Sequence, residues 1–231
     1  ATLPALGNGF AYDDIPIIVE NTALHAPGTL PGRLLEPYWP GGLYRPITLA
    51  LLGLEWQAGG GSPVLFHAVS IVVYAALAGM LVILALELGA PLVAAVAGGL
   101  VFAVHPVHSE VTANVVGQAE LVSAFWVLAM LLLYVRARRR GGPNGRDTAG
   151  ILGCFLLALH AKESGYVAAG LLVAVEFLVV PHLVAPPLDR SRLRAPALLL
   201  LATSLAALAV RALVLGAVGG ETPHLSWEGM G

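Results

Sequence analysis

The chain has 231 residues, of which 58% are hydrophobic and only 11% are charged, and its formal net charge at pH 7 is -2. An ordinary soluble domain carries about 25% charged residues, so this chain cannot cover a globular surface with polar groups. The composition therefore excludes a soluble domain, gives no basic surface for nucleic acid, and predicts an all-α protein that crosses a membrane several times. The single cysteine, Cys154, excludes an intrachain disulfide framework.

Residues 1–62 form a long polar segment that is rich in Pro and Gly and contains "FAYDD" and "YRPITLALLGLEW". The second stretch predicts an amphipathic helix at the membrane interface, because Pro46 suits a first helical turn and Tyr44 and Trp56 suit the headgroup level. We therefore expect a long extracytoplasmic first loop with one interfacial helix.

Six apolar runs follow, and each is a candidate for a membrane-spanning helix. They cover residues 63–88, 90–104, 119–135, 148–160, 165–184 and about 195–216. The second and fourth runs are shorter than the ~20 residues that a bilayer needs, so we expect them to borrow polar residues at their ends. Residues 217–231 are expected to begin another outer loop. Because the chain lacks an initiator Met, we expect a fragment of a longer protein with further helices on both sides.

Arginine placement predicts the orientation of these helices. Two gaps between apolar runs are rich in arginine, namely "RARRR" with Arg146, and "DRSRLR" at 189–194. Two crossings separate the gaps, so they lie on one side, which the positive-inside rule makes cytoplasmic. The N-terminal segment, the "HPVHSE" turn and the "AKES" turn then lie on the opposite, extracytoplasmic side.

The stretch "FAVHPVHSEVTANVVGQAE" places a polar cluster between two apolar runs. Pro106 is expected to end or kink the incoming helix, and residues 109–118 are expected to form a short interfacial helix. His105, His108 and Glu110 could bind a metal or position a substrate, although "HPVH" lacks the HExxH spacing. The alternative is that these residues cap helix ends.

Asp13 and Asp14 form an acidic pair on the predicted outer side. An outer carboxylate can act as a general base for a hydroxyl, and the pair is the candidate for holding a divalent cation such as Mg²⁺ or Mn²⁺. The alternative is a solvated turn or helix start, where Asp is common.

Cations also gather on the predicted outer side. Lys162 is the only lysine, and Arg211 lies within the last apolar run, where an ionisable side chain costs at least ~2.5 kcal/mol. Together with Arg45 they would suit a phosphate group. The alternatives are snorkelling and a simple Lys162–Glu163 ion pair. Glu176, in the middle of "LLVAVEFLVV", is either a proton relay or one half of a structural pair.

Taken together, "FAYDD", "YRPIT", "FHAVSIVVY", "HPVHSEVTANVVGQAELVSA", "AKESGYVAAGLL" and "VRALVLG" resemble, in register, the membrane part of the transmembrane O-mannosyltransferases with tetratricopeptide repeats. The resemblance implies the GT-C fold, with the active site in extracytoplasmic loops, in a bacterial inner membrane or the endoplasmic reticulum. Two departures are the absence of repeats and the absence of the first helix. Gln118 also stands where the family pattern has an arginine, so we expect that site to be altered.

The resemblance implies a transferase that moves a sugar, with mannose favoured, from a polyprenyl-phosphate donor to a Ser or Thr hydroxyl of a protein, with inversion. By resemblance, the catalytic base lies in the acidic pair, with Asp13 preferred and Asp14 in support. The donor phosphate and the sugar would be bound by the remaining candidates, which are Arg45, His105, His108, Glu110, Lys162, Glu163 and Arg211. Two other readings are a secondary transporter or channel, and an inactive membrane scaffold. Paired repeats and broken midplane helices, which are typical of transporters, are not evident.

Overall fold

The computed structural model describes residues 3–26, 28, 30–38, 42–183 and 194–216. Every element in this part of the chain is a helix, which confirms the all-α prediction. The helices are η1 Leu3–Gly7, η2 Ile15–Val19, α1 Thr22–His25, α2 Leu30–Arg33, α3 Pro46–Gly59, α4 Pro63–Glu87, α5 Leu92–Val104, η4 Pro106–His108, α6 Ser109–Ala113, η5 Val115–Gly117, α7 Gln118–Arg139, α8 Gly145–Ala161, η6 Glu163–Tyr166, α9 Val167–Ala174, η7 Val175–Val179, α10 Val180–Leu183 and α11 Arg194–Leu215.

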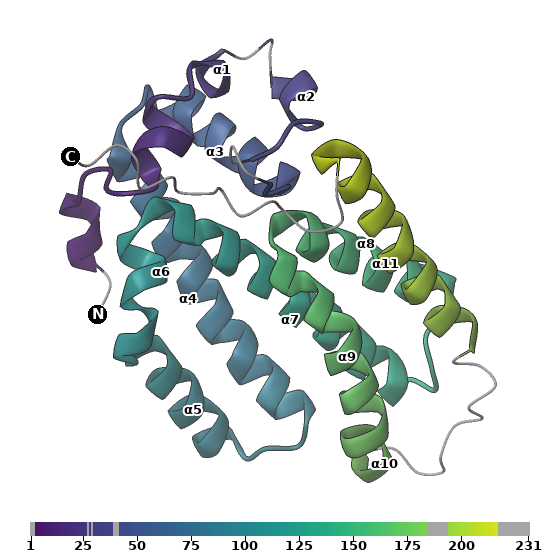
Figure 1. The fold of residues 1–231 in the computed structure, drawn as a ribbon. Coiled ribbons are helices and arrows are strands. Elements are labelled where there is room, and N and C mark those ends of the chain that lie inside the picture. Colours follow the sequence, from purple (N-terminus) through teal and green to yellow (C-terminus); the bar gives the residue numbers. More distant parts are fainter. Residues whose placement is uncertain (1–2, 27, 29, 39–41, 184–193, 217–231) are drawn as a thin grey trace, which may run out of the picture.

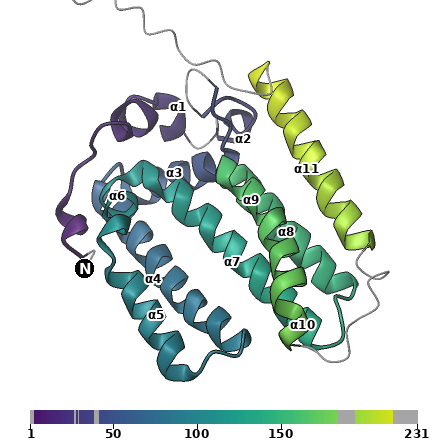
Figure 2. The same cartoon turned by 60° about the horizontal axis from the view of Figure 1, so that its bottom comes forward.

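The molecule has two parts, a bundle of long helices and a cap across one end of it (Figure 1). The hairpin of α4 and α5 lies on one side of α7, and α8 to α11 lie on the other side, as both ribbon views show (Figure 2). The cap consists of the N-terminal segment through α3. Helix α7 is the centre of the bundle, since half of its apolar stretch is buried, against 17% or less in the other candidate spans.

Local sequence explains where several helices begin. Pro46 and Pro63 open α3 and α4, where a missing N–H costs nothing. The side chain of Asn144 accepts hydrogen bonds from the amides of Arg146 and Asp147, and the carboxylate of Asp147 accepts one from the Asn144 amide. This capping box starts α8 at Gly145 rather than at the predicted residue 148.

All six predicted apolar runs are helices in the structure. Four of them are long and apolar enough to cross a membrane, and α5 with the bent segment Pro106–Ala113 is a fifth candidate if the two helices make one span. Their apolar side chains face outward, with Val93 and Leu213 more than four-fifths exposed. So much exposed apolar surface is unfavourable in water, whereas contact with the lipid chains of a bilayer favours it. The chain is therefore a multi-pass membrane protein, and six spans within 63–216 remain a prediction.

The turn after α5 behaves as predicted. Helix α5 ends at Val104, Pro106 begins η4, and the axis of the following segment is bent by 49°. The short helix expected within residues 109–118 is α6, followed by the single turn η5.

Helix α3 lacks the amphipathic pattern that we expected, while its position at the membrane interface stays a prediction. It buries its only carboxylate, Glu55, and exposes Leu54. The reason is tertiary: the inner face of α3 packs on α4 and α8, and Thr48 donates a 2.8 Å hydrogen bond to the carbonyl of Ala161 at the end of α8. Helix α3 is thus a structural part of the cap, fixed to the bundle.

The arginine-rich end of α7 is bound to its neighbours. Arg136 and Arg139 both pair with Glu87 at the end of α4. Arg138 is buried and pairs with Glu176 in the π-helix η7. Glu176 therefore has the structural partner that the sequence left open. Of the second predicted arginine cluster, positions 190 and 192 and the side chain at 194 lie outside the described residues.

Candidate active site

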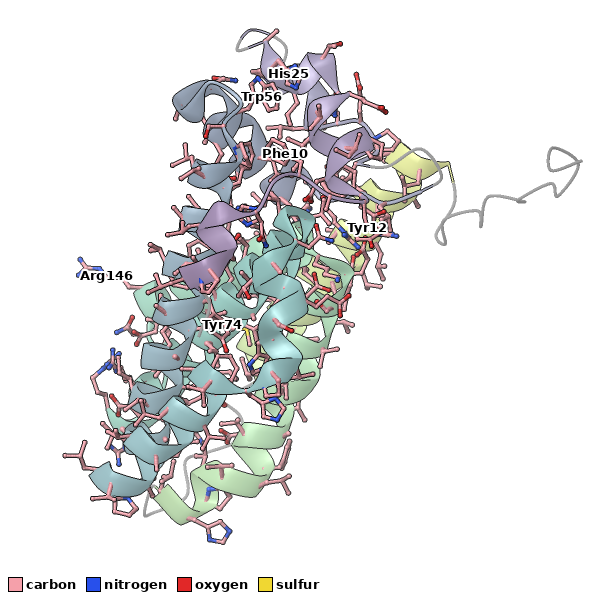
Figure 3. All side chains as sticks on the ribbon, turned by 90° about the vertical axis from the view of Figure 1, so that its left-hand side faces the viewer. Phe10, Tyr12, His25, Trp56, Tyr74 and Arg146 are labelled. Atoms are coloured by element: carbon pink, nitrogen blue, oxygen red, sulfur yellow. The ribbon has the colours of Figure 1, made fainter. Side chains whose placement is uncertain are left out.

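The cap holds its own hydrophobic core, which attaches it to α4 and to the turn before α7. This core consists of Ile17, Ile18, Leu24, Tyr38, Leu49, Leu52, Phe66 and Val115. Aromatic rings extend it: His25 stacks on Trp56 with centroids 3.6 Å apart, and Phe10 packs beside Trp56 (Figure 3). The cap is therefore a packed scaffold from which loop residues can be positioned.

The structure divides the acidic pair. Asp14 is completely buried, and its carboxylate accepts hydrogen bonds from the amides of Val116 at 2.9 Å, Ala11 at 3.0 Å and Val115 at 3.4 Å. Asp13 is exposed to solvent. Asp14 thus anchors the N-terminal segment to η5, and the neighbouring Asp13 is held at the surface.

Three charged side chains from distant parts of the sequence meet at the same end of the bundle. Arg45, at the start of α3, donates from Nε and Nη2 to one oxygen of Glu163, at 2.9 and 2.8 Å. Arg211, in α11, donates to the other oxygen at 2.9 Å and also to the carbonyl of Gly42 at 3.3 Å. The ring of Tyr38 lies under the Arg45 guanidinium, 5.3 Å from its centroid.

A close backbone approach puts Glu163 in this position. A Cβ atom on Gly165 would lie 2.5 Å from the carbonyl of Ala158, closer than real Cβ atoms come. Only glycine lets η6 fold back onto α8. Thr48 binds the neighbouring Ala161 carbonyl, so the start of α3, with Arg45, is held over the same turn.

The ion-pair partner of Lys162 is not Glu163, the alternative that the sequence offered. Lys162 pairs with Glu120 in the first turn of α7, so the simple Lys162–Glu163 ion pair is wrong. Burial lowers the pKa of Lys162, and the nearby positive charge of Arg45 lowers it further, while Glu163 and Glu110 act in the opposite direction.

The two histidines have unlike environments. His105 is exposed, and its Nδ1 accepts from the amide of Val107, which caps η4. His108 is half-buried, with its Nδ1 2.9 Å from the hydroxyl of Tyr74 and 3.0 Å from the carbonyl of Phe102. Among the described residues no group of three or more His, Cys, Asp or Glu side chains could hold a metal ion.

The acidic pair does not fit the divalent cation that the sequence suggested. Both oxygens of Asp14 already accept backbone amides, which leaves Asp13 as a single carboxylate. Magnesium and manganese need several oxygen ligands in a fixed geometry.

Two cavities share Tyr74 and His108 in their linings. The first is an apolar groove of about 520 Å³, lined by residues of α4, α7 and α9 such as Leu81 and Leu128, with Glu120 and Ser164 among its few polar residues. The second, of about 410 Å³, is more polar and lies between η1 and the α5–α6 turn. The apolar groove therefore reaches the two neighbours of the charged cluster, Glu120 and Ser164.

A buried polar pair, Glu55 and Gln118, lies between α3 and α7 and was not predicted from the sequence. Glu55 accepts a 3.1 Å hydrogen bond from Gln118, which also donates to the carbonyl of Phe66. Burial raises the pKa of Glu55 to about 8. A signal existed in the helical spacing, since Thr48, Leu52 and Glu55 fall on one face of a helix, but only the structure shows that this face is buried.

Comparison with known proteins gives relatives over most of the chain. Human protein O-mannosyl-transferase TMTC4 is 31% identical over 199 residues, covering 74% of this chain and 27% of that protein. Human protein O-mannosyl-transferase TMTC3 is 28% identical, with 77% and 20% covered. Drosophila melanogaster protein O-mannosyl-transferase Tmtc2 is 31% identical, with 86% and 22% covered.

The chain thus spans about a fifth to a quarter of the length of these curated relatives. No family model matches the chain, and no solved structure matches it. The resemblance drawn from the motifs is confirmed by these relatives. The chain is related in sequence to the protein O-mannosyl-transferases of the TMTC group.

Proposed function

We propose that this chain is the membrane part of a GT-C type glycosyltransferase. It moves a sugar, with mannose favoured, from a polyprenyl-phosphate donor to a Ser or Thr hydroxyl of a protein, with inversion at the anomeric carbon. The names of its relatives support protein O-mannosylation. The site's chemistry supports the lipid-linked donor and the outer-side location.

The observation that carries the proposal is that the three cations lie next to residues that line an apolar groove, because Glu120 binds Lys162 and Ser164 follows Glu163 in the chain. Arg45 and Arg211 converge on Glu163, and Lys162 binds Glu120, which lines the groove. An isoprenoid tail needs apolar walls, and its phosphate needs charged hydrogen-bond donors. A donor lying in the groove would bring its phosphate to these three side chains.

In the proposed reaction, Asp13 accepts the proton of the acceptor hydroxyl while that oxygen attacks the anomeric carbon. The bond between the anomeric carbon and the phosphate oxygen breaks, and polyprenyl phosphate leaves with the bonding electrons. Arg45, Lys162 and Arg211 stabilise the leaving phosphate, an effect that contributes on the order of 3 kcal/mol for a well-placed donor. His105, His108 and Glu110 shape the pocket for the sugar or the acceptor.

The test is Asp13→Asn in the full-length protein, reconstituted in liposomes with a polyprenyl-phosphate mannose and an acceptor polypeptide. Because Asp13 is exposed, the thermal midpoint should not change, whereas loss of a general base should lower the transfer rate by roughly 100-fold or more. An unchanged rate in this variant would remove Asp13 from the mechanism. An intact wild-type protein that transfers no sugar would favour the inactive scaffold.

Asp14→Asn is the matched control. It replaces one carboxylate oxygen by an NH2 group, which cannot accept, so the side chain can no longer accept from all three backbone N–H groups of residues 11, 115 and 116. We expect it to lower the free energy of unfolding by about 1–3 kcal/mol. Asp13→Asn should leave that quantity unchanged, so the two variants separate catalysis from anchoring.

A further inference from the structure

Tyr12, next to the exposed carboxylate of Asp13, has an unusual backbone. Its φ angle is 49°, and it is the only residue other than glycine with a positive φ in the part of the chain that the structure describes. Side chains with a Cβ rarely adopt this left-handed conformation, and among them Asn and Asp do so most easily. A tyrosine here therefore costs stability that Gly or Asn would not.

The surrounding turn forces this conformation. The amide of Asp14 donates to the carbonyl of Ala11 at 3.0 Å, and the amide of Ile15 donates to the carbonyl of Tyr12 at 3.1 Å. The buried Asp14 carboxylate closes the turn on the Ala11 amide and fixes it to Val116. The turn is thus held at both ends, and its central residues point away from the core.

The Tyr12 side chain itself gains nothing from packing. It is 89% exposed, and it is not among the residues that line the apolar groove or the polar cavity beside it. Figure 3 shows Tyr12 apart from the packed cluster of Phe10, His25 and Trp56. Neither the backbone nor the core of this fold explains an aromatic ring at position 12.

We propose that Tyr12 is a positioning residue for the polypeptide acceptor, an inference that rests on the proposed function. A tyrosine on a rigid turn offers a large amphipathic surface at little conformational entropy cost, which is why binding loops use it. Its neighbour Asp13 must contact the acceptor hydroxyl. The residues that flank this hydroxyl in an extended polypeptide then pass over the ring, because the acceptor approaches from the water side.

The lipid-linked sugar is a poorer occupant for the ring. Its phosphate is expected at Arg45, Lys162 and Arg211, and its tail in the groove, whereas Tyr12 projects from the cap into solvent. Tyr12 should therefore affect the acceptor and not the donor. This difference makes the assignment measurable.

The experiment compares Tyr12→Asn and Tyr12→Phe in the full-length protein, with Leu35→Asn as a matched control. Leu35 is another exposed apolar side chain of the cap, at 68%. Asn suits the left-handed backbone, so Tyr12→Asn should keep or raise the thermal midpoint. It should raise the KM for acceptor about 10-fold or more, with kcat and the KM for donor unchanged. Tyr12→Phe and Leu35→Asn should match the wild type.

A direct measurement of peptide binding tests the role of Tyr12 independently of the transfer reaction. Fluorescent peptides, each with a serine or threonine flanked by apolar, acidic or basic residues, are titrated onto the reconstituted proteins. Peptide binding by the wild type that Tyr12→Asn weakens about 10-fold supports the role of Tyr12, even if no sugar is transferred. Equal binding by both proteins, no saturable binding by the wild type, or a lower thermal midpoint in Tyr12→Asn would each overturn it.

Discussion

Glu55 is a carboxyl group that the fold buries with a neutral partner. One of its oxygens accepts a hydrogen bond from Gln118, and the other is buried without a partner among the described residues. Burial raises the pKa of Glu55 from 4.5 to about 8, even though the bond from Gln118 lowers it. The sequence resemblance expected an arginine at position 118, which would ion-pair with Glu55. Glutamine leaves Glu55 protonated and neutral at pH 7.

Glu55 should therefore make stability depend on pH. Because folding raises this pKa, the native state keeps a proton that the unfolded chain loses above about pH 4.5. The contribution is complete below pH 4.5 and is lost as pH rises toward 8, by up to roughly 1.4 kcal/mol per pH unit. Glu55→Gln should remove this dependence. Thermal midpoints from pH 5 to 9 in detergent check it, with the exposed Glu110→Gln as the control. Parallel profiles for wild type and Glu55→Gln would contradict the assignment.

Asp13 and Asp14 show that a sequence does not reveal which of two neighbouring residues is buried and which is exposed. The sequence predicted that the pair matters, because two outer carboxylates can do chemistry. It could not tell which of the two is buried, since the amides of Val115 and Val116 that bind the Asp14 carboxylate lie more than 100 positions away in the chain. The same holds for Lys162, whose partner Glu120 lies in another helix.

At the scale of elements, the ion pair between Arg138 and Glu176 connects α7 to the π-helix η7. Arg138 donates to both oxygens of Glu176, at 2.7 and 2.5 Å, and the hydroxyl of Tyr134 donates at 2.6 Å. The two charged side chains are only 4% and 10% exposed. A π-helix widens a turn and often marks a special site, and here it holds the carboxylate that faces α7.

Removing the Arg138 side chain should leave the buried charge of Glu176 without a counter-charge. We expect Arg138→Leu to lower the free energy of unfolding by about 3–5 kcal/mol, and Arg138→Leu with Glu176→Gln to recover most of that loss. Glutamine still accepts from the Tyr134 hydroxyl. Unfolding of the single and double variants in detergent measures the coupling.

Arg211→Leu with Glu176→Gln is the control for this cycle. Arg211 pairs with Glu163 and not with Glu176, so its effect and that of Glu176→Gln should add. Coupling between positions 211 and 176 would contradict the structure, as would failure of the Arg138–Glu176 double variant to recover stability.

The elements themselves could be predicted from the sequence because their signals are local. Long apolar runs predicted all six bundle helices, and Pro106 predicted the end of α5. The prediction of an amphipathic α3 was wrong because Glu55 is buried by packing against α4 and α7, and no local sequence pattern shows such packing. The capping box at Asn144 was also readable from sequence, yet the apolar run alone placed the start of α8 three residues late.

For the whole molecule, α7 separates two polar ends. Its first turn holds Glu120, which binds Lys162, and its last turn holds Arg136, which binds Glu87. The 22 residues of α7 make a helix of about 33 Å, close to the thickness of a bilayer core. Among the described residues, the cap, Glu110 and Lys162 gather at one end.

We therefore predict that the arginine-rich end faces the cytoplasm and the cap faces outward. Single cysteines at positions 110 and 140, in a Cys154→Ser background, can be labelled in sealed vesicles with a membrane-impermeant maleimide. The two positions should react from opposite sides. Labelling of both from the same side would reject this topology.

The charged cluster joins three distant parts of the chain: the start of α3, the turn after α8, and α11. Its centre is the Glu163 carboxylate, which takes two hydrogen bonds from Arg45 and one from Arg211. A carboxylate between two guanidinium groups occupies the place that a lipid phosphate would need. If the proposed function holds, the donor phosphate must share the arginines with Glu163 or replace it.

This competition predicts the behaviour of Glu163→Gln in the full-length protein. Without ligand, the variant should have a lower thermal midpoint than the wild type, because two half-buried arginines lose their counter-charge. Polyprenyl phosphate should then raise the midpoint of Glu163→Gln by more degrees than it raises that of the wild type, since a ligand that binds more tightly stabilises the folded state more.

The arginine variants test the same site from the other side. Arg211→Leu should weaken binding of the same lipid by about 1.5–3 kcal/mol, and Arg211→Lys should recover only part of this loss, because an ammonium lacks the fork of the guanidinium. Equal midpoint shifts in wild type and Glu163→Gln would mean that the carboxylate does not compete with phosphate. No shift in either protein would remove the lipid phosphate from the site and leave the Arg45–Glu163–Arg211 cluster as a structural clamp between the cap and α11.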